Sequence, residues 1–319
     1  MTIPDASPVF TQYDKPPSSA TAAEAEVEAD TILVVGATGT VGAEVTRRLG
    51  AAGARPLALT HAGHDGLVPR DWSGRVSADL DRPATLDAAL DGVDRLFLLT
   101  RQTSRQLAQE QAVVAAAARA GVGRVVKLSV FRADERSPLQ IARQHRRAER
   151  ALQDSGLQHT VLRPVFFMQN LFAMVRDGRV ATAAGDGRVA MIDARDIAAA
   201  AVAALTSVPA EGRVYTLTGP EAISFDTVAD TLGQRVGRAV RHVRVPAEAV
   251  SARLAAAGAE AWFAKDMAAL HRMLADGYED VVTSDVSALT GTPATTFARF
   301  AADFSTRFTP TPATPGSQK

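Results

Sequence analysis

The residues best suited to chemistry follow a short apolar run near the start of the chain. Residues 32–35 include three β-branched side chains, which predicts a buried parallel strand. A glycine-rich turn comes next, and an apolar period that starts at Val41 predicts a helix. A strand that passes through such a turn into a helix points backbone N–H groups at one place, which is the geometry of a pyrophosphate site. The residues predicted to hold a dinucleotide here are Gly36, Thr38, Gly39, Thr40, Val41 and Gly42.

The three glycines have the spacing Gly-x-x-Gly-x-x-Gly, which differs from the Gly-x-Gly-x-x-Gly of ordinary dinucleotide-binding folds. One glycine is needed for the turn, one for the approach of the diphosphate and one for packing of the helix. The alternative is a turn that needs glycine only for its own geometry. The two threonine hydroxyls and the strand–helix units that follow favour the dinucleotide site.

The composition is that of an ordinary globular protein. The chain has 319 residues, of which 46% are hydrophobic and 22% charged, enough for one large α/β domain or two smaller ones. A formal net charge of zero argues against a nucleic-acid-binding surface. No apolar run approaches the roughly 20 residues of a membrane span, and the N-terminus lacks the features of a secretory signal. We therefore expect a cytoplasmic monomer or homodimer that acts on a small molecule, without a nucleic-acid or membrane partner.

Several kinds of catalytic site are absent from the sequence. Cysteine does not occur, which excludes disulfides and thiol nucleophiles. The six histidines are scattered and do not predict a metal site, so no metal is expected. A Gly-x-Ser-x-Gly motif is also missing, which argues against a serine hydrolase.

Strands and helices alternate through the first half of the chain. Strands are predicted at 31–35, 55–60, 75–78, 94–100, 124–130 and 159–162, and helices at 40–52, 84–90, 104–120 and 137–154. Apolar strands that alternate with amphipathic helices predict a Rossmann-type, doubly wound parallel sheet in the α/β class.

The pattern is less regular after Pro164, and predicts a smaller mixed α/β substrate lobe. Its elements are short strands at 188–192, 213–217 and 241–245 and helices at 194–205, 224–236, 247–254 and 260–274. The predicted division is a disordered leader (1–30), a dinucleotide-binding domain (31–163), the substrate lobe (164–306) and a flexible tail (307–319).

Five segments together carry a resemblance to a known family. They are the glycine turn at 36–42, Val-Val-Lys-Leu-Ser at 125–129, the helix segment at 145–157, Leu-Arg-Pro-Val-Phe-Phe-Met-Gln-Asn-Leu at 162–171 and Ile-Asp-Ala-Arg-Asp-Ile at 192–197. Over roughly residues 31–305 the chain resembles NmrA-like atypical short-chain dehydrogenases/reductases, and is most similar to their NAD(P)H:quinone oxidoreductase type. The resemblance does not fix the reaction, because the family includes quinone, azo, enone and imine reductases and also redox sensors.

Ordinary members of this superfamily use a Tyr-x-x-x-Lys pair to protonate a carbonyl oxygen. Residues 129–150 contain neither Tyr nor Lys, which argues against an ordinary alcohol dehydrogenase. The resemblance places His145 where the family has Lys or His, and implies that it bonds the nicotinamide ribose or protonates a reduced quinone oxygen. The alternative is an exposed histidine on a basic helix face. A quinone needs less help than a ketone, because its reduced oxygen is a stabilised phenolate.

Ser129 and the segments around it are predicted to hold the substrate. Ser129 ends a strand at the ligand-binding edge of the sheet, and is predicted to be catalytic by holding substrate or the carboxamide. Its alternative is a hydroxyl that satisfies a turn. Pro164, Phe166 and Phe167 are predicted to line the space for the nicotinamide and an aromatic substrate, and core packing is the alternative for one of the two rings. The predicted substrate contacts are Val130, Phe131, Pro164, Phe166, Phe167 and Asn170.

The remaining cofactor contacts are predicted at the ends of three strands. Thr60 and His61 end one of these strands, and Leu99, Thr100 and Arg101 end another; the resemblance implies adenine contacts at Asp79 and Leu80 after the third, and places His145 at the nicotinamide. Asp79 has an alternative role as an acid at a helix N-terminus. Neither the arginine that selects NADP nor the acid that selects NAD follows the second strand directly. NADP(H) is slightly favoured over NAD(H), because His61, His64, Arg70 or Arg75 could reach a 2′-phosphate.

The sequence therefore predicts an NAD(P)H-dependent reductase of a quinone or a similar conjugated or aromatic acceptor. Two alternatives remain open: a dinucleotide-sensing regulator without turnover, and a biosynthetic enone or imine reductase.

Overall fold

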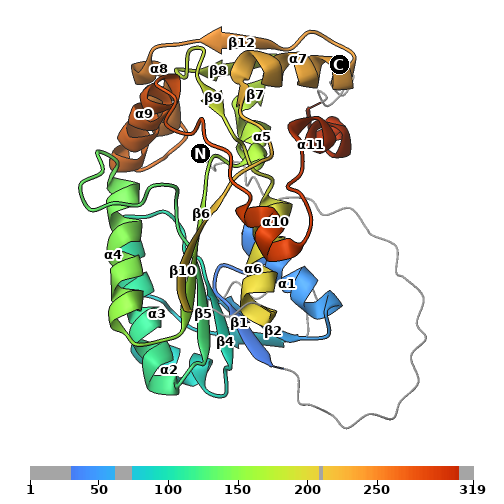
Figure 1. Cartoon of the computed structure of the whole chain (residues 1–319). Coiled ribbons are helices and arrows are strands. Elements are labelled where there is room, and N and C mark those ends of the chain that lie inside the picture. Colours follow the sequence, from blue (N-terminus) through green and yellow to red (C-terminus); the bar gives the residue numbers. More distant parts are fainter. Residues whose placement is uncertain (1–29, 62–73, 208–210, 309–319) are drawn as a thin grey trace, which may run out of the picture.

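A parallel sheet of seven strands forms the centre of the computed structural model, which describes residues 30–61, 74–207 and 211–308. The strand order is β10-β6-β5-β4-β1-β2-β3, so the order reverses between β1 and β4 (Figure 1). That reversal is where ligands bind in doubly wound sheets. The strands are β1 (Thr31–Val34), β2 (Arg55–Thr60), β3 (Gly74–Ser77), β4 (Arg95–Leu98), β5 (Arg124–Leu128), β6 (His159–Pro164) and β10 (Glu211–Leu217).

Helices cover both faces of this sheet, because the strands are apolar on both sides (Figure 1). Ile32 and Val34 face one cluster, together with apolar residues of α1 (Thr40–Ala51) and α6 (Ala194–Thr206). Leu33 and Leu96 face the other. The helices on that second side are α2 (Ala84–Leu90), α3 (Gln106–Ala120) and α4 (Gln140–Asp154).

The second lobe has its own core, which lies beyond the carboxyl ends of the strands. A cluster rich in phenylalanine joins α7 to α11 and to a small sheet of order β12-β8-β7. Its other elements are short. The bounds are η2 (Met168–Asn170), α5 (Leu171–Met174), β7 (Val175–Arg176), β8 (Arg179–Thr182), β9 (Arg188–Val189), β11 (Ile223–Ser224), α7 (Phe225–Val236), β12 (Arg241–Arg244), α8 (Ala247–Ala256), α9 (Ala261–Ala275), α10 (Asp285–Thr290), α11 (Phe297–Asp303) and η3 (Ser305–Phe308).

The predicted fold class is confirmed, and the predicted elements up to β6 are all present. The chain crosses the proposed domain boundary at residue 163 more than once. Strand β10 pairs in parallel with β6 and so belongs to the central sheet. Helix α6 packs against α1 on one face of that sheet, so neither element belongs to the second lobe. The boundary stays a proposal, and the leader and tail lie outside the described residues except at their inner ends.

Across the described ranges, no helix combines the length and the apolar character that a membrane span requires.

Candidate cofactor and substrate site

The glycine turn fits a dinucleotide because each glycine is needed for a different steric reason. Gly36 has φ +80°, and a Cβ there would lie 2.5 Å from the carbonyl oxygen of Leu99. A Cβ on Gly42 would lie 2.1 Å from the carbonyl oxygen of Gly36, so the helix packs on the turn only with glycine. A Cβ on Gly39 would meet one atom, the Gly36 oxygen at 3.3 Å. That single contact is tight, but no other atom of the described residues lies near this Cβ position, so a ligand can approach there.

The N-terminus of α1 is open at the same place. Thr38, Gly39 and Thr40 are exposed, and Gly39 caps the helix without a side-chain hydrogen bond. The first turn contains no acidic residue. The first N–H groups of a helix have no partner within it, and they attract negative charge. The predicted contacts Val41 and Gly42 are buried beneath this opening. These residues fit the diphosphate of a dinucleotide.

A cavity of about 340 Å³ lies beside the predicted adenosine contacts. It is lined by residues at and after the ends of β2 and β3 and by one residue of α2: His61, Ser77, Ala78, Asp79, Arg82 and Thr85. Asp79 Oδ1 lies 3.6 Å from His61 Nε2, and Asp79 Oδ2 lies 3.8 Å from Arg82 Nε. Thr60 is buried at the end of β2, and Leu80 is half-buried next to the cavity. Arg75 lies within β3 and does not line the cavity, and His64 and Arg70 lie outside the described residues.

A fully buried ion pair lies behind the ends of β4 and β5. Lys127 Nζ is 2.6 Å from Glu110 Oε2, and neither side chain is exposed. Glu110 Oε1 accepts a hydrogen bond from the Thr100 hydroxyl at 3.0 Å. Leu99 is half-buried and Arg101 is exposed on the same connection. Through Thr100, the ion pair therefore holds the connection after β4, which is one of the segments predicted to bind the cofactor.

His145 joins this network and is not an exposed helix residue. Its exposed fraction is 3%, its Nδ1 lies 3.4 Å from Lys127 Nζ and its Nε2 lies 3.0 Å from Gln106 Nε2. An ammonium can only donate, so Nδ1 accepts and the ring proton sits on Nε2. Gln106 Oε1 is buried without a partner, and turning this amide would give Nε2 an acceptor. Burial and the Lys127 charge hold the pKa of His145 well below its usual value.

Ser129 belongs to a neighbouring charged network. Its hydroxyl donates to Glu149 Oε1 at 2.5 Å, and the side chain is buried. Arg163 binds both oxygens of the same carboxylate, from Nε at 2.9 Å and from Nη2 at 2.5 Å. Since the Ser129 proton is engaged by Glu149, the free lone pairs of its oxygen can accept a hydrogen bond from a ligand.

The predicted substrate residues separate into two groups. Phe131 is buried at the end of β5 beside half-buried Val130, and Phe167 packs on the main core near buried Pro164. The Phe166 ring instead packs edge-on against Phe225, with 6.0 Å between centroids, in the core of the lobe. Asn170 is exposed and makes no side-chain cap for α5. Phe131 and Phe167 remain the stronger candidates for substrate contact.

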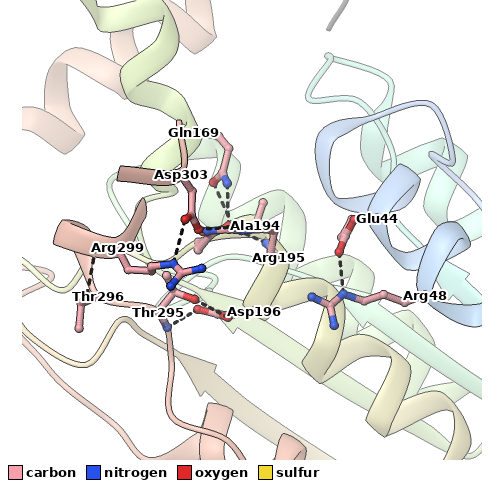
Figure 2. A network of polar contacts seen from close by, with 11 residues as sticks. Glu44, Arg48, Gln169, Ala194, Arg195, Asp196, Thr295, Thr296, Arg299 and Asp303 are labelled. Atoms are coloured by element: carbon pink, nitrogen blue, oxygen red, sulfur yellow. Dashed lines mark hydrogen bonds and ion pairs between the residues drawn. The ribbon is translucent and has the colours of Figure 1, made fainter. Parts of the chain in front are cut away.

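Figure 2 shows how the loop after β6 is fixed to α6 and α11. Gln169 donates to Asp193 Oδ1 at 2.8 Å and accepts the Ala194 N–H at 2.9 Å. Arg195 pairs with Asp193 at 2.7 Å and with Asp303 at 2.8 Å. These contacts raise the pKa of Arg195. Hydrogen bonds thus hold the segments 162–171 and 192–197 together, where the chain passes between the central sheet and the second lobe.

Comparison with known proteins gives one consistent result. The model of the NmrA-like family matches residues 28–300. The chain is 38% identical to an NAD(P)H azoreductase of Xenophilus azovorans, covering 85% of this chain and 96% of the relative. It is 38% identical to a (4-alkanoyl-5-oxo-2,5-dihydrofuran-3-yl)methyl phosphate reductase of Streptomyces griseus subsp. griseus, covering 88% and 99%. The NADPH-dependent quinone oxidoreductase of Escherichia coli, solved with NADPH, aligns with a TM-score of 0.76 at 29% identity, covering 86% and 99%.

The chain belongs to the NmrA-like family. The family resemblance inferred from the motifs is therefore confirmed.

Sequence reasoning gave no role to several residues of this NmrA-like site. Lys127 is the one charged residue in the apolar run 125–128, and a charge inside a buried strand must be paired. The lysine inside this apolar strand could have predicted a buried acidic partner, which the structure shows to be Glu110. Tyr278 and Arg132 lie far apart in the chain, and no spacing or periodicity connects them. Their contact appears only once the lobe is folded over the sheet.

Glu279 is a second buried carboxyl near the end of β6. Its Oε2 accepts the Phe166 N–H at 2.8 Å, and burial raises its pKa to about 7. Its pKa in the unfolded chain is about 4.5, so the folded protein binds more protons between these values. Glu279 therefore stabilises the fold most below pH 4.5, and this contribution is lost as the pH rises through 7.

The variant Glu279→Gln keeps the acceptor and removes the titration. We expect its free energy of unfolding, relative to the parent protein, to rise by about 3 kcal/mol between pH 4.5 and 8. Urea titrations of both proteins across this range measure the difference. Subtracting the two curves cancels His271, whose lowered pKa of about 4 acts with the opposite sign. A flat difference would show that Glu279 titrates normally.

Proposed function

We propose that this protein transfers a hydride from NAD(P)H to a quinone or a similar conjugated or aromatic acceptor without a Tyr-x-x-x-Lys relay. Family membership and the reductase relatives make it an NAD(P)H-dependent oxidoreductase. The proposal rests on two features near the carboxyl edge of the central sheet. The glycine turn after β1 leaves space for a ligand at Gly39, and the buried His145 contacts Lys127 of β5.

The relatives support the acceptor class. An azo group and the 4-alkanoyl-5-oxo-2,5-dihydrofuran named for the Streptomyces reductase, whose ring double bond is conjugated with its carbonyls, are both conjugated acceptors. A conjugated acceptor delocalises the charge that a hydride brings, so it needs less proton assistance than a ketone. This fits residues 129–150, which contain no Tyr and no Lys.

The cofactor, when bound, supplies the hydride, and the chain's own residues position it. The exposed N-terminus of α1 would hold the diphosphate. The Ser129 oxygen, whose proton is given to Glu149, would accept from the carboxamide N–H. Phe131 and Phe167 would limit the space for the acceptor and exclude water.

We propose that His145 acts as a neutral ring. Lys127 donates to its Nδ1 and the turned amide of Gln106 accepts from its Nε2–H, so both ring nitrogens are engaged and the ring positions the buried Lys127–Glu110 pair beside the bound molecules. An imidazolium is disfavoured there by burial and by the Lys127 charge, which lower its pKa.

The variant His145→Ala tests this role. We expect cofactor affinity to change little and kcat to fall about tenfold to a hundredfold, because the network that positions the ends of β4 and β5 beside the reacting groups loses one member. In the parent protein, kcat should not change with pH around 6.5, since His145 stays neutral there. Steady-state rates between pH 5.5 and 8 measure both effects. Unchanged turnover in the variant, or a break near pH 6.5 that the variant abolishes, would contradict the proposal.

For the cofactor we propose a slight preference for NADP(H). Arg82 brings a positive charge and His61 a ring nitrogen to the cavity of about 340 Å³, where a 2′-phosphate would lie. Asp79 opposes this, because an acid at such a site favours the 2′-hydroxyl of NAD. The two effects predict a small preference rather than exclusive use of one cofactor.

The test is oxidation of NADPH and of NADH, followed by absorbance, with matched quinone and azo acceptors. Turnover with either cofactor establishes the reductase, and the ratio of the two kcat/KM values measures the preference. Tight binding of both cofactors without oxidation across the panel would favour the dinucleotide-sensing alternative.

A further inference from the structure

Arg132, which has no ion-pair partner among the described residues, lies at the end of β5, where the proposed acceptor would enter. We propose that Arg132 and Tyr278 form a binding site for an anionic group, such as a phosphate, sulfonate or carboxylate, carried by the acceptor. This inference rests on the proposed function for its location, because it names a chemical feature of the substrate of that same site.

Arg132 is held over two aromatic rings. Its guanidinium carbon lies 4.9 Å from the centroid of the Phe131 ring and 5.0 Å from that of the Tyr278 ring. The two rings meet edge-on at 5.4 Å, so the guanidinium lies against both members of one aromatic pair. Stacking of this kind fixes the plane of a guanidinium and leaves its N–H groups free to bind an oxyanion.

The backbone at Arg132 is unusual. Its φ is +48°, and among the described residues only one other non-glycine residue, Asp177, has a positive φ. A left-handed arginine costs of order 1 kcal/mol and persists where the surrounding structure imposes it. Here the preceding residue is fixed, because the Phe131 N–H donates to the Pro164 carbonyl oxygen at 3.0 Å. The strain directs the Arg132 side chain across Phe131 toward Tyr278.

Tyr278 adds a hydroxyl group to the same place. Its ring is half-buried, and its hydroxyl makes no hydrogen bond to any residue in the described part of the chain. Burial, with the neighbouring Glu279 charge, raises its pKa to about 12, so it carries its proton at neutral pH. A neutral phenol can donate one hydrogen bond to an anion.

The charged neighbours leave Arg132 as the available cation. Arg163 is bound by both oxygens of Glu149. Asp134 accepts the Arg136 N–H at 2.7 Å and lies near the Arg136 side chain. Glu279 is directed inward to the Phe166 N–H. Arg132 itself has no carboxylate within ion-pair distance among the described residues, so its charge is free for a ligand.

The experiment uses two redox-inert ligands, naphthalenesulfonate and naphthalenesulfonamide, which share shape but differ in charge. Their dissociation constants are measured by calorimetry on protein saturated with NADP⁺, so that the diphosphate site is filled. We expect the sulfonate to bind more tightly. The variant Arg132→Gln should weaken sulfonate binding about tenfold, because a charge-assisted hydrogen bond is lost, and should change sulfonamide binding less than about twofold.

Two further variants complete the test. Tyr278→Phe keeps the ring and should weaken only sulfonate binding, by about threefold to tenfold. Arg136→Gln removes an exposed arginine from the same loop and serves as the matched control, with no expected effect. Arg132→Asn, a residue that tolerates positive φ, replaces Arg132→Gln if the latter disturbs folding.

The outcome is separate from that of the proposed function, because binding needs no turnover. Equal affinity of the unmodified protein for both ligands would overturn the inference. Equal losses for both ligands in Arg132→Gln, or the same loss in Arg136→Gln, would also overturn it. Failure to reduce any acceptor, with the selective sulfonate loss intact, would reject the reductase and leave the anion site.

Discussion

The variant Gly39→Val is expected to bind NADPH at least about a hundredfold more weakly while it folds normally. Valine fits the backbone there, because Gly39 has φ −82° and ψ 169°, an extended conformation that β-branched residues adopt readily. Its two methyl groups would fill the exposed approach to the N-terminus of α1. A diphosphate held by backbone N–H groups needs that approach, and each lost charge-assisted hydrogen bond contributes about 1.5–3 kcal/mol. Fluorescence titration with NADPH measures the loss.

Two other glycines of the same helix supply the controls. A Cβ on Gly50 has no heavy atom within 4 Å, so Gly50→Val makes the same change without blocking the turn. It should bind NADPH normally. A Cβ on Gly42 would lie 2.1 Å from the Gly36 oxygen, so Gly42→Ala should lower the unfolding temperature and thereby mark a packing defect. Normal NADPH binding by Gly39→Val would place the diphosphate elsewhere.

The fold could be predicted because its determinants are local. The strand β2 begins and ends at the predicted residues, and α2 does as well, since each is bounded by turn residues. The helix α3 ends where Gly121 adopts φ +71°, the left-handed conformation predicted for that glycine. The short elements β7 and α5 escaped prediction because they have too few residues to show a period.

The position of β10 could not be predicted from the sequence. Its residues 211–217 show a strand pattern, but nothing local distinguishes a strand of the main sheet from one of the lobe. The choice depends on pairing with β6, more than 40 residues earlier in the chain, and on α6 packing against α1. Long-range pairing decides the architecture here, whereas the pattern decides only the type of element.

The same distinction between local and long-range determinants applies to the site residues. The glycine turn lies in one continuous segment, and its steric demands are visible in the sequence. The surroundings of His145 come from two distant elements, β5 and α3, and burial changed its expected chemistry: an exposed imidazole would titrate near pH 6.5, whereas the buried ring beside Lys127 stays neutral. A residue type can be read from the sequence, but its protonation depends on neighbours that only folding brings together.

The variant Lys127→Met is expected to lower the free energy of unfolding by about 3–5 kcal/mol, which is the usual effect of removing one partner from a buried ion pair. Methionine fills a similar volume, so the loss reports the charge rather than a cavity. Glu110 would keep only the Thr100 hydroxyl at 3.0 Å. One such neutral donor compensates a buried carboxylate poorly. Urea unfolding at pH 7.5 measures the change.

A second variant distinguishes a charge effect from general damage to the core. In Lys127→Met combined with Glu110→Gln, the unpaired charge is absent, so the double variant should be more stable than Lys127→Met alone. Removal of the lysine also removes the cation next to His145, and the pKa of His145 should rise. Any activity retained by Lys127→Met should then depend on pH in a range where the parent protein is flat. Equal stability of the single and double variants would show that the Lys127 stem, rather than its charge, supports this part of the sheet.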